Sequence, residues 1–298
     1  MTVATAFKPE ARRNRLVQLL RSYPLLSYFV IAYAITAAYD FLVMVPNPDF
    51  PSFPRDFGPS VAALLVTAAL GGRSAVKALL GRLVLWRVQA RWYLFVFICI
   101  PAIFTLGIVM VPGAVASFRA PSLAEWLVVP GFVAFLYTLV FGGPLFEEPG
   151  WRGFALPRMQ TRWGPLLSTV VLALLWAAWH FTEYLTDPGF AATNGGLTPQ
   201  GIGVFVLAAL SFSIILTWVF NHTQGSLLIA ILVHAMINWS QLLTSSIFPA
   251  AGTNENGPLI AFGAVAVVLV LATRGRLGFA GGRFDLADRP LTGLEAPA

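Results

Sequence analysis

The sequence predicts an all-α, polytopic integral membrane protein with about eight transmembrane helices. Of its 298 residues, 57% are hydrophobic and 11% are charged, which departs strongly from the composition of soluble domains. The apolar residues also gather in runs of the length that a helical crossing requires, roughly 20 residues. We place these runs near 24–46, 57–71, 92–113, 127–160, 164–185, 201–220, 225–247 and 257–273.

The ends and connections of the runs carry further signals. The first run has no credible signal-peptidase site and is too long for a signal peptide, so we expect it to be retained. The second is short, and the fourth is long and interrupted. The basic connection 72–91 is either an interfacial amphipathic helix or an ordinary loop. Residues 186–200 are rich in Gly, Pro and Asn, which predicts a loop.

The basic residues predict the orientation in the membrane. Of 19 Lys and Arg residues, 17 fall in alternate connections, and only Arg55 and Arg119 lie on the other side. The positive-inside rule then places both termini in the cytoplasm of a multi-pass protein of the cell membrane. This distribution favours the lipid bilayer, not nucleic acid, as the partner of the +6 net charge. Cys99 is the only cysteine, which excludes an internal disulfide and a Cys-based metal cluster.

Two adjacent carboxylates, Glu147 and Glu148, lie inside the interrupted fourth run. An ionised group at the centre of a bilayer costs roughly 2.5–3.5 kcal/mol on insertion scales and usually marks a reaction centre or a transport path. Gly and Pro residues surround the pair and weaken the helix there. Where the helix resumes after Pro149, Glu148 and Arg152 are four residues apart and can pair on one face. Glu147 then points about 100° away.

Histidines on later runs are expected to reach the same depth. Trp176 and His180 share one helix face, as do His234 and Asn238, because each pair is four residues apart. Glu147 lies 16 residues before the turn at 163–164 and His180 lies 16 residues after it. Both therefore sit about 24 Å along adjacent antiparallel helices. A carboxylate, two imidazoles and an amide are thus expected to form one polar pocket.

This set of groups suits acyl hydrolysis. A buried carboxylate can accept a proton from water, an imidazole can orient that water, and a second imidazole with an amide can stabilise an oxyanion. The alternative is a zinc ion bound by Glu147, His180 and His234. No HExxH motif occurs in the chain, so the single-helix zinc protease signature is absent.

Three motifs in this order resemble the CPBP family, the CAAX protease and bacteriocin-processing (Abi) intramembrane proteases. They are EExxxR from Glu147 to Arg152, an aromatic-xxx-His ending at His180, and HxxxN from His234 to Asn238. In the second motif Trp176 stands where the family more often has Phe, which we expect to be harmless. The resemblance covers about residues 125–245.

The resemblance implies an intramembrane endopeptidase that hydrolyses membrane peptide or protein substrates. Glu147 would be the general base, His180 its partner on the water, and His234 with Asn238 the oxyanion hole. Glu148 and Arg152 would support them as an ion pair. We expect no tightly bound metal, because the Asn238 amide beside His234 is a poor zinc ligand and Arg152 brings a positive charge close to the site. The alternatives are a catalytically inert membrane binding or immunity protein and a proton-coupled transporter.

The chain then divides into five segments. They are a basic cytoplasmic N-terminal segment (1–23), accessory transmembrane helices with an interfacial helix (24–124), the CPBP-like catalytic core (125–247), a last transmembrane helix with its flanks (248–276) and a polar cytoplasmic tail (277–298). Outside the motifs, we expect Asp40 to be a water-facing or helix-end charge, Glu183 to be an interfacial carboxylate and His222 to be a solvated turn residue.

Overall fold

All regular structure in the described part of the protein is helical, which confirms the all-α class. The computed structural model describes residues 17–47, 55–127, 131–252 and 254–281. Six helices are long and apolar enough to cross a membrane: Pro24–Met44, Arg55–Val84, Ala90–Val109, Pro165–Thr186, Pro199–His222 and Leu227–Ile247. A shorter apolar helix, Asn256–Ala272, and the interrupted run from Phe132 to Trp163 occupy the other two expected places.

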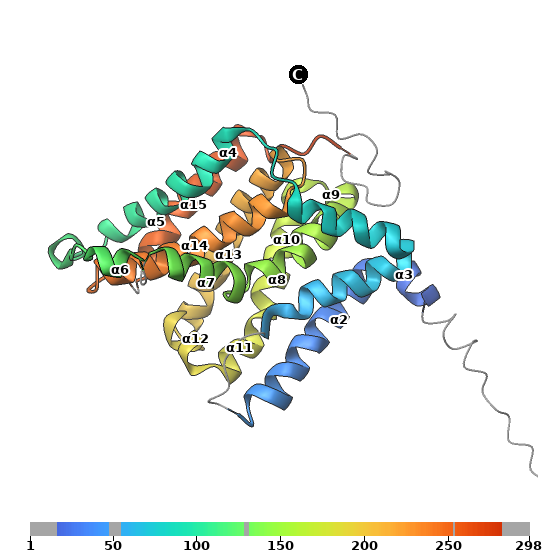
Figure 1. The fold of residues 1–298 in the computed structure, drawn as a ribbon, viewed down its shortest axis with the longest axis horizontal. Coiled ribbons are helices and arrows are strands. Elements are labelled where there is room, and N and C mark those ends of the chain that lie inside the picture. Colours follow the sequence, from blue (N-terminus) through green and yellow to red (C-terminus); the bar gives the residue numbers. More distant parts are fainter. Residues whose placement is uncertain (1–16, 48–54, 128–130, 253, 282–298) are drawn as a thin grey trace, which may run out of the picture.

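The first two helices form a pair at one side of the molecule (Figure 1). Helix α2 (Pro24–Tyr39) continues into the π-helix η1 (Asp40–Met44), and α3 (Gly58–Gly81) follows the short η2 (Arg55–Phe57). The two helices approach closely at Gly58, which has no side chain. A Cβ atom at this position would overlap Thr36 Oγ1. Helix α3 kinks at Gly72, where the expected span 57–71 ends.

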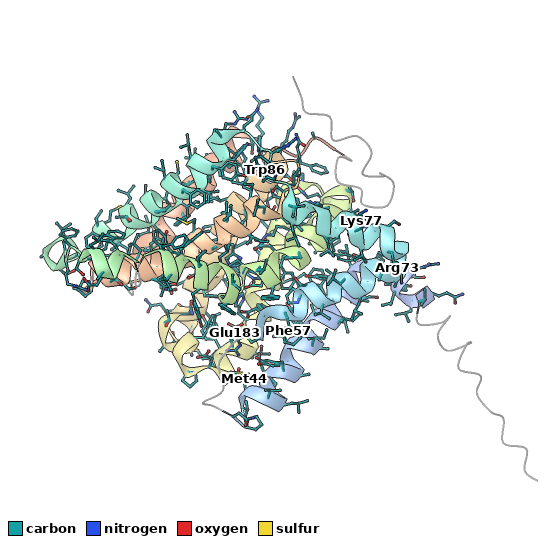
Figure 2. The ribbon with its side chains drawn as sticks, in the orientation of Figure 1. Met44, Phe57, Arg73, Lys77, Trp86 and Glu183 are labelled. Atoms are coloured by element: carbon teal, nitrogen blue, oxygen red, sulfur yellow. The ribbon has the colours of Figure 1, made fainter. Side chains whose placement is uncertain are left out.

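The predicted 72–91 connection begins as helix and not as a loop. Helix α3 runs on to Gly81 and is followed by η3 (Arg82–Val84). The basic side chains of Arg73 and Lys77 extend from this part of α3, far from Phe57 at its start (Figure 2). The second of the two alternatives for this connection, an ordinary loop, is therefore wrong for its first half.

Two further helical units lie on the opposite side of the molecule. Helices α4 (Ala90–Leu94) and α5 (Ile100–Val109) are joined by the π-helix η4 (Phe95–Cys99) into one continuous rod. It packs against α15 (Asn256–Ala272), and Gly107 and Gly257 face each other where the two backbones touch. Small residues at such crossings are typical of helices in membranes. The short η5 (Val115–Ser117) and α6 (Leu123–Leu127) follow this rod.

The fourth run is broken before its carboxylates and not at Pro149. Helix α7 (Phe132–Phe141) ends at Gly142, and Gly143 adopts a φ of 93°. The chain is then helical without interruption through α8 (Pro144–Glu148), the π-helix η6 (Pro149–Ala155) and α9 (Leu156–Trp163). Pro149 is accommodated because it begins a π-helical segment, in which the regular helical hydrogen-bond pattern is already altered.

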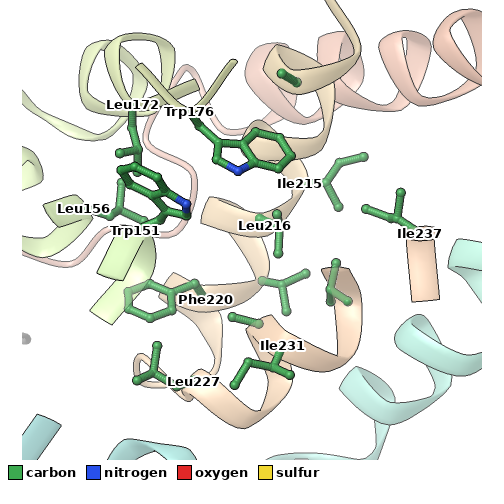
Figure 3. Close-up of a cluster of buried hydrophobic side chains, with 14 of the residues drawn as sticks. Trp151, Leu156, Leu172, Trp176, Ile215, Leu216, Phe220, Leu227, Ile231 and Ile237 are labelled. Atoms are coloured by element: carbon green, nitrogen blue, oxygen red, sulfur yellow. The ribbon is translucent and has the colours of Figure 1, made fainter. Parts of the chain in front are cut away.

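Three long helices enclose this segment and complete the core. They are α10 (Pro165–Trp179), α13 (Pro199–His222) and α14 (Leu227–Ile247). Figure 3 shows Trp151 of η6 and Leu156 of α9 packed with Leu172 and Trp176 of α10 and with apolar side chains of α13 and α14. The core of the protein therefore surrounds the EExxxR segment.

The 186–200 segment is not a plain loop. Helix α11 (Phe181–Thr186) follows α10, and α12 (Pro188–Thr193) lies inside the segment. The Asp187 side chain caps α12 by accepting a hydrogen bond from the Phe190 amide (2.9 Å). The expectations for residues 1–16 and for the tail beyond residue 281 concern segments outside the described residues.

Candidate active site

The side chain of Glu147 is positioned by the helix break that precedes it. Gly143 begins α8, and its carbonyl accepts a hydrogen bond from the Glu147 amide (3.0 Å). A Cβ atom on Gly143 would overlap Glu147 Oε1, and the φ of 93° also disfavours any residue with a side chain. Glycine at this position therefore gives the Glu147 carboxylate the space that it occupies. That side chain is buried, with 3% of its surface exposed.

Glu148 accepts hydrogen bonds from an arginine and a histidine. Its Oε1 atom accepts hydrogen bonds from Arg152 NH1 (2.9 Å) and from His234 Nδ1 (2.7 Å). The predicted Glu148–Arg152 pair is present, and both residues are fully buried. The contact with His234 was not foreseen from the sequence. It links η6 and α8 to α14, and Arg152 adds a link to α13 through Ser213 (3.0 Å).

Trp176 contacts four of the six candidate residues, namely Glu147, Arg152, His180 and His234. Its indole Nε1–H donates to Glu147 Oε2 (2.6 Å). Its ring lies edge-on to His180 (5.0 Å between centroids) and His234 (5.5 Å). The Arg152 guanidinium lies 5.5 Å from the same ring centroid. Trp176 therefore joins Glu147 of α8 to the two histidines, and Phe at this position could not donate that hydrogen bond.

In both His180 and His234, the Nδ1 atom is the ring nitrogen that donates a hydrogen bond to the protein. His180 Nδ1 donates to the Trp176 carbonyl (2.8 Å), and His234 Nδ1 donates to Glu148, because carbonyl and carboxylate oxygens only accept. In each ring this leaves Nε2 as the nitrogen that can bind a substrate or a water molecule. His180 and His234 are 7% and 4% exposed.

Asn238 is oriented toward the helix break. Its Nδ2 atom donates to the Gly142 carbonyl (3.2 Å), one residue before Gly143. An amide nitrogen carries two hydrogens, so this bond occupies one of them. Asn238 thus lies beside the segment that holds Glu147, as expected for a residue of the same pocket.

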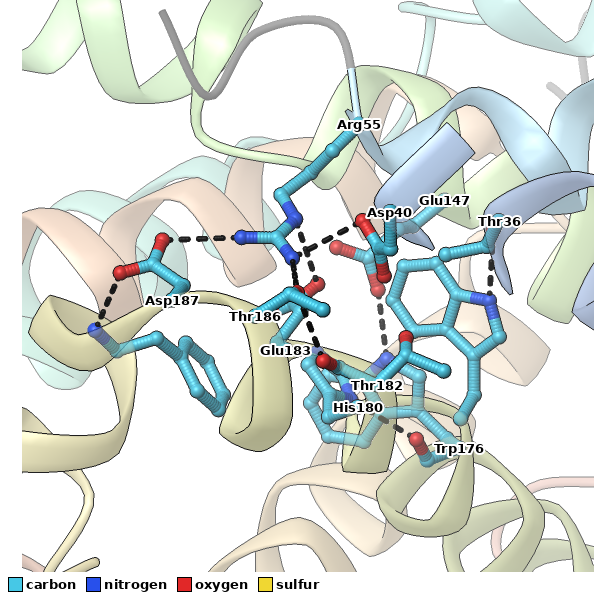
Figure 4. Close-up of polar contacts among 12 residues, drawn as sticks. Thr36, Asp40, Arg55, Glu147, Trp176, His180, Thr182, Glu183, Thr186 and Asp187 are labelled. Atoms are coloured by element: carbon cyan, nitrogen blue, oxygen red, sulfur yellow. Dashed lines mark hydrogen bonds and ion pairs between the residues drawn. The ribbon is translucent and has the colours of Figure 1, made fainter. Parts of the chain in front are cut away.

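Arg55 forms a buried ionic network beside the candidate residues (Figure 4). It donates to Asp40 Oδ1 (3.0 Å), Asp187 Oδ2 (2.9 Å) and Thr186 Oγ1 (2.8 Å), and its Nε lies 3.8 Å from Glu183 Oε1. Asp40 is fully buried and Glu183 is 5% exposed. Asp40 stands at the end of α2, as one of its two predicted alternatives has it, but it does not face water, and Glu183 is a buried carboxylate of this network.

This network also borders Glu147. The Asp56 carboxylate lies next to Glu147 at Gly143, since both would contact a Cβ atom placed there. On the other side, the Phe190 ring of α12 stacks on His180 at 5.7 Å between centroids. Asp187 caps α12 and binds Arg55. Arg55 of η2 therefore connects η1, α11 and the start of α12 around one side of the candidate site.

The side chains do not form a compact metal-binding group. Among the described residues, no three His, Cys, Asp or Glu side chains are grouped so that they could hold a metal ion. The Nδ1 atoms of both histidines and Oε2 of Glu147 already have protein partners. Zinc coordination by Glu147, His180 and His234 would require these side chains to move closer together.

Residues 129–240 match the family model described as "Type II CAAX prenyl endopeptidase Rce1-like". The resemblance to this family is confirmed. A curated relative, the CAAX prenyl protease 2 of Methanococcus maripaludis, is 29% identical over 154 residues. The alignment covers 50% of this chain and 55% of that protein, so the chain spans about half the length of the relative that it matches.

The CAAX-endopeptidase-like segment, residues 129–240, contains all six candidate residues and also Glu183 and Asp187. Asp40, Arg55 and Asp56 lie before it and complete the network from the first two helices. One signal in the sequence pointed to Arg55, because it is one of only two basic residues outside the basic connections. Its partners are 15 and more than 125 residues away, which sequence patterns do not reveal.

Proposed function

We propose that this protein is an intramembrane endopeptidase that hydrolyses peptide bonds with a water molecule activated by Glu147. One observation carries the proposal. Within the CAAX-endopeptidase-like segment, Glu147, His180 and His234 surround Trp176, and each histidine is held by Nδ1 so that Nε2 remains for chemistry. The multi-pass helical fold places these groups in the interior of a membrane protein.

The reaction would use each group once. The Glu147 carboxylate takes one proton from water while Nε2 of His180 accepts a hydrogen bond from the hydrogen that stays on the oxygen, and this oxygen bonds to the peptide carbonyl carbon. Nε2–H of protonated His234 and the second Nδ2 hydrogen of Asn238 stabilise the oxyanion. Glu148 orients the His234 ring by accepting its Nδ1–H. Glu147 finally gives its proton to the departing amine.

The substrate class follows from the same site. A buried reaction centre in a helical membrane protein is suited to peptide or protein substrates that are associated with the membrane. The relative is described as a CAAX prenyl protease, so a prenylated peptide ending in C-a-a-X is the first substrate to test, beside an unmodified peptide of the same sequence.

The test is peptide cleavage by the full chain purified in detergent. Glu147→Gln, His180→Ala and His234→Ala should each lower the rate by at least about 100-fold. Groups that act on the attacking water contribute roughly 10²–10⁴-fold, and an oxyanion-hole donor contributes roughly 10²–10³-fold. Glu125→Gln is the matched control, because Glu125 is a carboxylate on α6 that pairs with the exposed Arg119 away from the site. Full activity in any of the three variants would remove its assigned role.

Two further measurements, peptide binding and proton transport in vesicles, separate the two alternatives. A wild-type chain that binds the peptide without cleaving it would favour an inert binding or immunity protein. A chain that does not cleave peptide but moves protons across a vesicle membrane in exchange for a solute would favour a transporter.

We also propose that hydrolysis needs no tightly bound metal. Asn238 accompanies His234 on α14, and an amide is a good oxyanion donor but a poor zinc ligand. The Arg152 guanidinium, 5.5 Å from the Trp176 ring, brings a positive charge that disfavours a dication. Exhaustive chelation should leave the cleavage rate unchanged. Stoichiometric zinc in the active protein, with activity lost on its removal and restored on its return, would contradict this proposal.

The orientation that we propose has both termini in the cytoplasm. Its support is the 17-to-2 division of the basic residues between alternate connections. Under this orientation, Arg55 and the α12 segment belong to the non-cytoplasmic half of the protein.

A further inference from the structure

A cavity lies at the end of the bundle where α4 begins and α13 ends. It has a volume of about 350 Å³, which falls in the range of small-molecule sites. None of the six candidate active-site residues lines it. Its lining includes Arg91, Trp92, Phe95, Cys99, Trp218 and His222. The α4 end of the molecule lies on the opposite side from α11 and α12 (Figure 1).

The wall of this cavity is a packed group of aromatic rings. Trp92 lies edge-on to Trp218 at 5.0 Å, and Phe95 lies 5.4 Å from Trp218. The His222 ring lies 5.4 Å from Trp92 and 5.3 Å from Trp218. This apolar wall is suited to an alkyl chain.

The chain after α15 packs against His222 and its neighbour Asn221. Asn221 Nδ2 donates to the Leu277 carbonyl (2.9 Å), and Gly278 packs directly against the His222 ring. His222 Nδ1 donates to the Trp218 carbonyl (2.8 Å), which fixes the plane of the ring. His222, the last residue of α13, is exposed, as the sequence predicted, and its ring is oriented at the rim of the cavity.

The charge at the rim selects the ligand. The Arg91 guanidinium lies over Trp92 at 5.3 Å from the ring centroid. All described residues that line the cavity are apolar, aromatic or basic, and none carries a carboxylate. An aromatic cage for a quaternary ammonium group leaves the ring face to the ligand cation, whereas here Arg91 already occupies the face of Trp92. The rim therefore favours an anion.

We propose that this cavity binds one anionic phospholipid. Its phosphate binds Arg91 and His222, and one acyl chain lies along Trp92, Phe95 and Trp218 toward Cys99. Tryptophan rings at the headgroup level with a basic residue beside them are typical of a membrane interface. Cys99 lies eight residues after Arg91, about 12 Å deeper along the helix. The lipid would join α4, α13 and the segment after α15 at one end of the molecule.

The lone, exposed Cys99 supplies the probe for the test. The protein, with a fluorophore attached to Cys99, is reconstituted into phosphatidylcholine nanodiscs. One set of nanodiscs contains a fraction of phosphatidylglycerol with a nitroxide on its acyl chain, and the other contains the same fraction of phosphatidylcholine with the same nitroxide. Labelled phosphatidylglycerol should quench the fluorophore several-fold more at the same fraction. Arg91→Gln should abolish this difference. Arg87→Gln, the matched control, should retain it, because Arg87 lies over Trp86 and does not line the cavity.

Equal quenching by the two lipids, or an unchanged preference in Arg91→Gln, would overturn the proposal. Native mass spectrometry of the unlabelled wild-type chain measures the lipid preference without a fluorophore in the cavity. It should show retention of one phosphatidylglycerol molecule and no phosphatidylcholine. Soluble glycerol phosphate at the same concentration should not displace the lipid. Displacement would show that the acyl chain contributes nothing and would also overturn the proposal.

Discussion

Trp176 is the residue about which the candidate site is arranged. Its indole N–H binds Glu147, and its ring contacts both histidines. The sequence indicated only an aromatic residue one helical turn before His180, for which Phe and Trp are equivalent. The difference between them is a hydrogen-bond donor, and its value depends on an acceptor from another helix.

Trp176→Phe should therefore destabilise the protein more than Trp179→Phe. The Trp176 indole donates to a carboxylate, and hydrogen bonds to charged groups contribute about 1.5–3 kcal/mol. Trp179 donates to the Thr36 hydroxyl (3.0 Å), and neutral bonds contribute about 0.5–1.5 kcal/mol. Thermal unfolding in detergent compares the two, and the excess loss should shrink in a Glu147→Gln background. Equal losses in both backgrounds would contradict the importance of this bond.

The charged residues illustrate the same limit of sequence reasoning. The pairing of Glu148 with Arg152 could be predicted because it depends only on helical spacing. The burial of Asp40 and Glu183 could not, because their partner Arg55 lies on a different helix. Breaking a buried pair by removing one partner leaves the other charge uncompensated, so these acids are part of the folded core.

At the scale of elements, the break at Gly142–Gly143 determines where Glu147 points. The sequence predicted a weakened helix from its Gly and Pro residues but not which of them breaks it. Pro149 is tolerated in a π-helical segment, whereas Gly143 adopts a φ of 93° and starts α8 in a new direction. The closeness of Glu147 Oε1 to Gly143 depends on this start.

Gly143→Ala should lower cleavage about 100-fold, since a displacement of roughly 1 Å at a reacting group can have that effect. The added methyl group would overlap Glu147 Oε1. Gly164→Ala is the matched control, because Gly164 also has a positive φ, 74°, but a Cβ atom there meets nothing within 4 Å. Both variants should lose thermal stability from backbone strain, on the order of 1–3 kcal/mol each. Normal cleavage by Gly143→Ala would show that the break does not position Glu147.

At the scale of the whole molecule, the distribution of basic residues sets the expected orientation. In a Cys99→Ser background, single cysteines at Ser74 and Thr193 should be labelled from opposite faces by an impermeant thiol reagent. Both positions are exposed, on α3 beyond its kink and at the end of α12. Labelling of both from one face of oriented vesicles would refute the orientation.

The sequence by itself determined the class of this protein, its apolar spans and the six candidate residues. These features depend on local quantities, namely the hydropathy of a window, the four-residue spacing of a helix face and the order of three motifs. Only the tertiary structure decided that Trp176 binds Glu147, that Glu148 binds His234 and that Arg55 joins Asp40 to α11 and α12. Each of these contacts joins side chains of different helices, so its geometry depends on how the helices pack and not on spacing within one helix.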